Sequence, residues 1–246
     1  MSIRPRHLLF GLAPTLSLAV ALASTPPDDD PPAEPTPQSE FEEHSIRGWT
    51  VFVHESMRER EPERLDQALE LLSCCLYDVT RALPETAVEE LHKVKIWFDP
   101  RDRHHACAVY HPSAGWLRRN DYDVAKTDSV HITNLRRFLQ WTREQPSMVL
   151  HELAHAYHDQ VLGFDQPEVI AAHQRAKRDG GYDEVLTASG HNRRHYALTD
   201  HKEFFAELTE SVFGTNDFYP FVRAELGQHD PESRALVEKL WGVRGR

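Results

Sequence analysis

The sequence has fewer basic than acidic residues, and this imbalance argues against one large class of binding partner. It holds 28 lysines and arginines against 39 aspartates and glutamates, so the formal net charge is −11. No stripe of basic residues interleaved with aromatics interrupts this acidic background. Because nucleic acids and anionic membrane surfaces repel a protein of this charge, we expect no nucleic-acid partner.

The N-terminal apolar run is shorter than the roughly 20 residues that a membrane span requires. It covers residues 8–23, contains Pro14, follows two arginines and ends in Ala-Leu-Ala, a pattern typical of signal-peptidase cleavage. We therefore predict a signal peptide at 1–23 and a secreted or periplasmic protein, with no membrane insertion after cleavage. An uncleaved membrane anchor is the alternative. Cleavage would bring the net charge to about −13.

Aromatic residues are absent from the next segment, 24–40, which holds six prolines and five acids. Such a composition cannot form a core, so we predict an extended, disordered tether. Docking of a partner is the alternative role. The globular domain is predicted to cover 41–246, and it shows no internal repeat.

Cysteine is also scarce, with only three in the chain. Cys74 and Cys75 are adjacent, and Cys107 is alone. Export would allow a disulfide between one of the pair and Cys107. Three buried cysteines that serve as small apolar residues are the alternative, and the sequence does not decide between the two.

The apolar pattern of the domain predicts strands first and helices afterwards. Leucines at helical spacing after a proline predict a helix at 62–83, and further helices start at Asn134 and at Pro146. The polar stretch around Gly115, between the third and fourth strands, is predicted to be a loop. Helices against one face of a small sheet give an α+β fold. The predicted strands are 49–55, 93–99, 106–111 and 128–133.

The stretch MVLHELAHAYHDQ (148–160) places two histidines one helical turn apart, about 6 Å along the axis. Imidazoles at this spacing can bind one metal ion, so His151 and His155 are candidate ligands. Glu152 projects beside the ion, where it could act as a general base toward water. His158 is too far along the helix to join the same ion, and we expect a surface or second-layer histidine there.

A second helix is predicted over 199–214, capped by Thr199 or Asp200. It carries the acidic residues Glu203, Glu207 and Glu210 on one stripe. Three glutamates usually form a solvated face. A zinc ion with two histidine ligands, however, needs one more protein ligand and an open position for water.

HELAH followed by EFFAE resembles the gluzincin metallopeptidases, most closely the catalytic domain of anthrax lethal factor and its relatives. The resemblance covers roughly residues 147–214 and implies a zincin-like domain with one Zn²⁺ per chain. In that family the first glutamate of EFFAE is the third metal ligand, which implies Glu203. A tyrosine seven residues before it assists catalysis, which implies Tyr196. The rest of the toxin is absent, so its substrate does not carry over.

The same resemblance implies further details of the site. Glu207 would accept a hydrogen bond from His151, with a surface glutamate as the alternative. The strand at 106–111 would form the sheet edge that pairs with an extended substrate, and the strand at 128–133 would lie inside it. Three nearby histidines remain as alternative ligands or transition-state donors: His191, His195 and His201.

Together these patterns predict an exported zinc metallopeptidase that hydrolyses a peptide or protein substrate, with Glu152 as general base. Two alternatives stay open. One is a non-catalytic zinc-binding structural or adhesion module of protease descent. The other is a zinc amidase that acts on cell-wall cross-links, because the same site would serve that chemistry.

Overall fold

The computed structural model describes residues 40–100 and 107–243. The predicted signal peptide at 1–23 and all of the predicted tether except Glu40 lie outside the described residues. Within the described part of the chain, no helix combines the length and apolar character that crossing a membrane requires.

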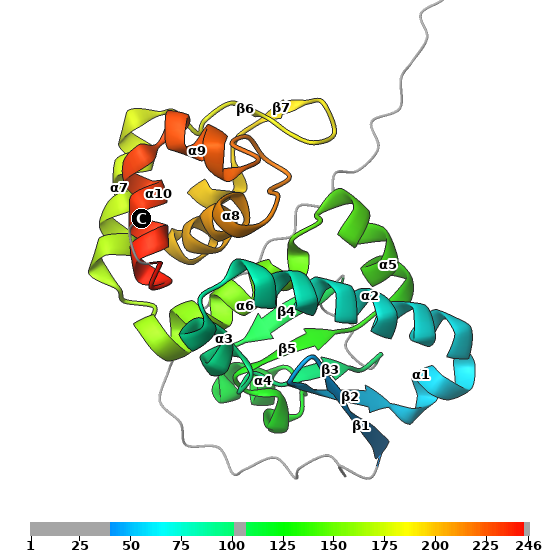
Figure 1. Ribbon diagram of the computed structural model, residues 1–246. Coiled ribbons are helices and arrows are strands. Elements are labelled where there is room, and N and C mark those ends of the chain that lie inside the picture. Colours follow the sequence, from blue (N-terminus) through cyan, green and yellow to red (C-terminus); the bar gives the residue numbers. More distant parts are fainter. Residues whose placement is uncertain (1–39, 101–106, 244–246) are drawn as a thin grey trace, which may run out of the picture. The chain divides into compact units, whose positions relative to one another are not determined.

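A five-stranded mixed sheet underlies the candidate site, with the strand order β1-β2-β3-β5-β4 (Figure 1). The central strands β2, β3 and β5 are parallel, and the edge strands β1 and β4 are antiparallel to their neighbours. All four predicted strands are confirmed with shorter ends, and β4 lies at the edge beside β5 as expected. No pattern in the sequence indicated β1. The strands are β1 Phe41–Ile46, β2 Trp49–His54, β3 Ile96–Phe98, β4 Ala108–His111 and β5 Ser129–Ile132.

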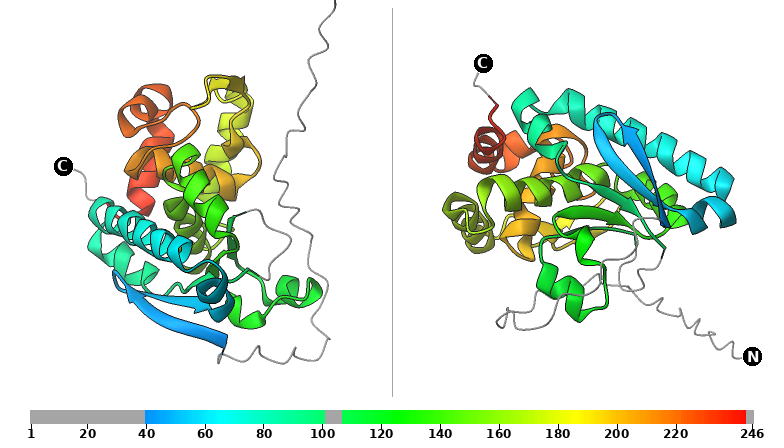
Figure 2. Two further views of the ribbon diagram at one scale, coloured as in Figure 1. Left: turned by 90° about the vertical axis from the view of Figure 1, so that its right-hand side faces the viewer. Right: turned by 90° about the horizontal axis from the view of Figure 1, so that it is seen from below.

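Two long helices lie on one face of this sheet (Figure 1, Figure 2). Helix α2, Pro62–Ala82, begins with a proline and buries Leu65, Leu72 and Leu76 completely, which confirms the helix predicted there. Helix α6, Met148–Tyr157, packs between α2 and the C-terminal helices. This half of the molecule also contains the helices α1 Glu55–Arg60, α3 Glu85–Leu91 and α5 Leu135–Glu144.

The stretch around Gly115 is not the loop that the sequence predicts. Residues Ala114–Arg119 form helix α4 on the other face of the sheet (Figure 1). Ser113 caps this helix, because its hydroxyl accepts a hydrogen bond from the backbone N–H of Trp116. Leu117 is fully buried and anchors the helix. A serine cap and one buried leucine are enough for so short a helix, whose polar surface conceals it in the sequence.

The C-terminal half consists of helices around α8, His201–Phe213 (Figure 1). Helix α8 confirms the predicted second helix, and Asp200 is its cap. Trp241 closes the group: its ring stacks on Tyr157 at 4.0 Å, and its indole N–H donates to Thr209. No pattern in the sequence predicted the other helices and strands of this half. They are α7 Pro167–Asp179, the β6–β7 hairpin (Val185–Leu186 and Asn192–Arg193), α9 Arg223–His229 and α10 Pro231–Leu240.

The three cysteines are free thiols. Cys107 is buried and Cys75 half-buried, while Cys74 is exposed on α2. The disulfide alternative is therefore not realised, and Cys107 fills the role of a small apolar residue. Burial raises the pKa of the Cys107 thiol to about 12, so it stays protonated.

Candidate metal centre

Helix α6 is apolar on nearly all sides because it is the central helix of the molecule. Its buried side chains include Leu150, Leu153 and Ala154, and it contacts α2, α8, β4 and β5. A π-helical turn, His158–Leu162, extends it to Gly163, whose φ of 79° ends the helix. The polar residues that remain on so buried a helix need partners, and these partners define the site.

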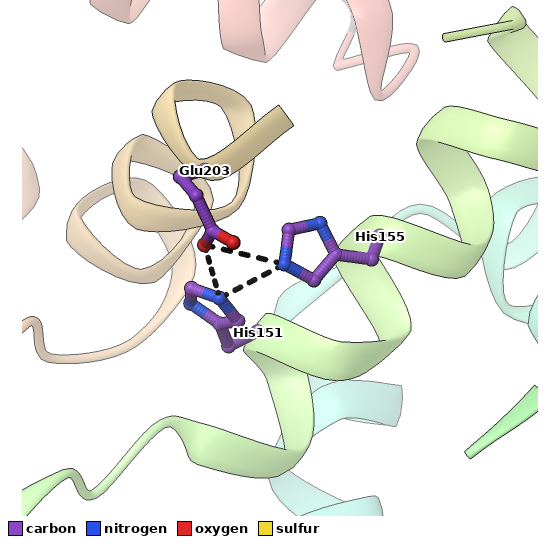
Figure 3. A group of neighbouring side chains, drawn as sticks. All are labelled: His151, His155 and Glu203. Carbon is purple, nitrogen blue, oxygen red and sulfur yellow. Dashed lines mark hydrogen bonds and ion pairs between the residues drawn. The ribbon is translucent and has the colours of Figure 1, made fainter. Parts of the chain in front are cut away.

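Three metal-ligand candidates meet between α6 and α8 (Figure 3). The Nε2 atoms of His151 and His155 lie 3.0 Å apart. The Oε2 atom of Glu203 lies 3.1 Å from the first of these nitrogens and 3.4 Å from the second. The structure therefore brings together the three residues that the sequence and the resemblance predicted as ligands.

This triangle fits a zinc ion. Tetrahedral zinc with bonds of about 2.0–2.1 Å holds its ligand atoms roughly 3.3 Å apart, which matches the observed edges. The environment also favours positive charge. Burial alone would lower the pKa of His151, but hydrogen bonds to Glu203 and Glu210 outweigh it and raise that pKa well above the ordinary value. The carboxylates of Glu203 and Glu210 around the buried His151 imidazole therefore form a suitable cation site.

Helix α8 presents Glu203 in its first turn. The Asp200 side chain accepts hydrogen bonds from the backbone N–H groups of Lys202 and Glu203, which fixes the start of the helix. Burial opposes ionisation of Glu203, yet the two facing histidines lower its pKa below the ordinary range. The carboxylate is therefore ionised, as a metal ligand must be.

The acceptor behind His151 is Glu210, not the Glu207 that the resemblance implied. His151 Nδ1–H donates to Glu210 Oε1 at 2.7 Å, whereas Glu207 Oε1 is 3.7 Å away. Glu207 is buried, so it is not a surface residue either. Its carboxyl instead accepts a hydrogen bond from the Asn216 side chain at 3.0 Å. The partner of His151 thus comes from one turn further along α8.

Burial raises the pKa of both buried glutamates. Burial, reinforced by the charge of Glu210, raises the pKa of Glu207 well above its ordinary value. Burial also raises the pKa of Glu210, although the hydrogen bond from His151 opposes this. Of the two, only Glu210 has the hydrogen bond from His151 that favours its charged form. This arrangement orients the imidazole with its Nε2 lone pair toward the other ligands.

Glu152 lies outside the ligand triangle and contacts the edge strand instead. Its Oε2 accepts a hydrogen bond from the backbone N–H of Tyr110 in β4 at 2.7 Å. Nothing in the sequence pointed to Tyr110, because this contact joins residues 42 positions apart. A carboxylate with one oxygen bound in this way still has a second oxygen with which to accept a proton.

Tyr196 begins a 3-10 turn, Tyr196–Leu198, that leads into α8. Its phenol is half-buried and close enough to Glu203, Glu207 and Glu152 to be affected by their charges. Burial first, and then these carboxylates, raise its pKa above the ordinary value. The hydroxyl therefore stays protonated and can donate a hydrogen bond near the site.

The other candidate histidines do not join the triangle. His201 Nε2–H donates to the carbonyl of Phe164 at 2.7 Å, and His191 is exposed. His195 is buried, and its Nδ1 accepts from the N–H of Ala197. His158 is fully buried against aromatic rings, so the predicted surface position is wrong.

Comparison of the chain with protein-family models, curated proteins and solved structures finds no match.

Proposed function

We propose that this protein is an exported zinc metallopeptidase with a zincin-like domain. The observation that carries the proposal is the position of Glu152: it directly follows the candidate ligand His151 on α6, and its carboxylate accepts a hydrogen bond from the backbone N–H of Tyr110 in the edge strand. A purely structural zinc site needs neither a free carboxylate nor an open edge strand beside it. The pattern at residues 1–23 supports export.

The residues of the chain divide the chemistry among them. His151, His155 and Glu203 would hold Zn²⁺, which would polarise the attacking water and the scissile carbonyl when bound. Glu152 takes a proton from the water and later gives it to the nitrogen of the leaving amine. Tyr196 donates a hydrogen bond to the oxygen that becomes negative in the transition state.

The position of β4 at the edge of the sheet supports a peptide substrate. Thr133 N–H donates to the carbonyl of Cys107, and the antiparallel register with β5 continues from there. Alternate residues of an edge strand turn their backbone groups away from the neighbouring strand, so Ala108 and Tyr110 present theirs outward. Because the Tyr110 N–H already donates to Glu152, a peptide would pair with the Ala108 N–H and with the carbonyls of the two residues. An extended peptide can pair with such an edge through its main chain, which gives affinity without strong sequence selection.

Digestion of a broad peptide library by the zinc-loaded protein tests this proposal. Glu152→Gln should keep the metal and the fold but lower hydrolysis by roughly two to four orders of magnitude. Glu144→Gln, which removes an exposed carboxylate from α5, is the matched control and should be fully active. Equal hydrolysis by the wild type and Glu152→Gln would contradict the assignment of the base.

The library also separates the two alternatives. A zinc-binding structural or adhesion module would bind metal but cleave nothing. An amidase specific for cell-wall cross-links would leave linear peptides intact and release products from a cross-linked cell-wall fragment.

A further inference from the structure

Tyr110 contacts the metal-site helix at two levels, once through its backbone and once through its side chain. The backbone N–H donates to Glu152 at 2.7 Å. The phenol O–H donates to Asp159 Oδ2 at 2.8 Å, and it accepts a hydrogen bond from the Gln160 side chain at 3.0 Å. One residue of the edge strand is thus bound to Glu152 and also, further along the helix, to Asp159 and Gln160.

The spacing along the helix explains how one tyrosine can do this. Glu152 and Asp159 are seven residues apart, which is two helical turns and about 10 Å. A tyrosine that lies along the helix covers most of that distance between its backbone nitrogen and its hydroxyl oxygen. Asp159 and Gln160 belong to the π-helical turn His158–Leu162, and both reach the same phenol. Successive side chains of a regular α-helix diverge by about 100°, so the wider turn suits this double contact.

The phenol is a buried and fully paired group. The Tyr110 side chain is largely inaccessible, and burial raises its pKa above the ordinary value, so the hydroxyl remains a donor. Gln160 also donates to the carbonyl of Asp128 at 3.2 Å, just before β5. Asp128 N–H in turn donates to the carbonyl of His111 at 2.7 Å, at the end of β4. The π-helical turn therefore holds both strands at this end of the sheet.

We propose that Tyr110 is a positioning residue for Glu152. Its phenol is held by Asp159 and Gln160, and this fixes the position of β4 along α6. In that position the Tyr110 N–H, which points away from β5, donates to the Glu152 carboxylate. That contact uses one carboxylate oxygen, and the other oxygen would take part in the proton transfer. The consequence for catalysis rests on the proposed function, whereas the positioning itself does not.

Nuclear magnetic resonance on the ¹⁵N-labelled full chain tests the positioning without any assay of activity. The amide of residue 110 is observed in zinc-loaded and in chelator-treated protein. Tyr110→Phe and Asp159→Ala should accelerate its hydrogen exchange at least about tenfold, because each removes the anchor but not the amide. The amide proton should also move upfield as the short bond to the carboxylate weakens.

Two matched variants separate positioning from general packing. Asp159→Asn keeps an oxygen that accepts from the phenol, so exchange should stay within about threefold of the wild type. Tyr157→Phe removes a hydroxyl from the same helix, where it donates to the Leu240 carbonyl at 3.3 Å, and should leave the residue 110 amide unchanged. The proposal is overturned if Tyr110→Phe leaves the exchange rate of the residue 110 amide unaltered, or if Tyr157→Phe accelerates that exchange as much as Tyr110→Phe does. It is also overturned if Asp159→Asn accelerates the exchange as much as Asp159→Ala.

Kinetics then test the catalytic consequence. Tyr110→Phe should lower kcat roughly tenfold with KM within about twofold of the wild type, because a displaced base affects the chemical step more than binding. An unchanged kcat would overturn the catalytic part of the proposal. A wild type that cleaves nothing would refute the proposed function instead, and the amide measurements would still decide whether Tyr110 holds Glu152.

Discussion

His151 donates its Nδ1 proton to Glu210 across 2.7 Å, from α6 to the helix that also carries the candidate ligand Glu203. Glu203 and Glu210 are seven residues apart on α8, so they lie two turns from each other on one face. His151 therefore contacts both ends of this face, with Nε2 toward Glu203 and Nδ1 toward Glu210. The imidazole has only one orientation that satisfies both carboxylates.

Removal of this support should weaken metal binding. Glu210→Gln is expected to lower zinc affinity about 10–100-fold, because the histidine loses the charged partner that orients it and increases its basicity. Glu207→Gln is the matched control, since its carboxyl is 3.7 Å from the ring, and it should have a smaller effect. Competition with a chromogenic chelator measures both constants. A larger loss in Glu207→Gln would restore the assignment implied by the resemblance.

The ligands themselves give a simpler test. We expect one zinc per wild-type chain, and no stoichiometric zinc in His151→Ala or Glu203→Ala, because two protein ligands do not complete a catalytic site. Elemental analysis after dialysis decides this. His191→Ala, at an exposed histidine, should retain the full zinc content. Full zinc content in His151→Ala would show that the metal binds elsewhere.

Tyr196 separates a working peptidase from a protein that only binds metal. If its phenol donates to the oxyanion, Tyr196→Phe should lower kcat roughly ten- to a thousand-fold with little change in KM. Zinc content should not change, because the hydroxyl is not among the ligands. Steady-state kinetics on any cleaved peptide measure the effect. Unaltered kcat would mean that Tyr196 only packs.

His158 should make the protein sensitive to acid. Burial lowers its pKa from 6.5 to about 3, so between these values the unfolded chain binds a proton that the folded chain does not. The free energy of unfolding should therefore decrease as pH falls from about 6.5 toward 3, by up to about 1.4 kcal/mol per pH unit. In His158→Leu the free energy of unfolding should decrease less steeply with falling pH. Urea unfolding at several pH values, with chelator present, compares the two; parallel slopes would contradict the prediction.

The parts of the fold that the sequence revealed are those with strong local signals. Helices α2, α6 and α8 combine regular apolar spacing with a proline or a capping residue at the start, and the strands are short apolar runs. Helix α4 was missed because its single buried leucine, Leu117, gives no periodicity. The helices around α8 were missed for a similar reason: their surfaces are largely polar, and packing onto α8 stabilises them more than their own sequence does.

The candidate site was predictable only where its residues share one helix. His151, Glu152 and His155 follow from spacing alone, and Glu203 and Tyr196 came from the resemblance. Glu207 and Glu210 lie on the same face of α8, so the choice between them depends on how that helix crosses α6. The contact of Tyr110 with Glu152 depends on where the edge strand meets the helix, which no local pattern encodes.

The separation of His151 and Glu203 onto two helices has a consequence for the stability of the whole C-terminal half. A cation bound to both would act as a cross-link that closes a loop of about 50 residues, including α7 and the β6–β7 hairpin. By the chain-entropy argument used for disulfides, closure of such a loop lowers the conformational entropy of the unfolded chain, which stabilises the folded state by about 4 kcal/mol. The melting temperature would then depend on the concentration of free metal. Scarcity of the ion would loosen the C-terminal helices as well as stop the chemistry.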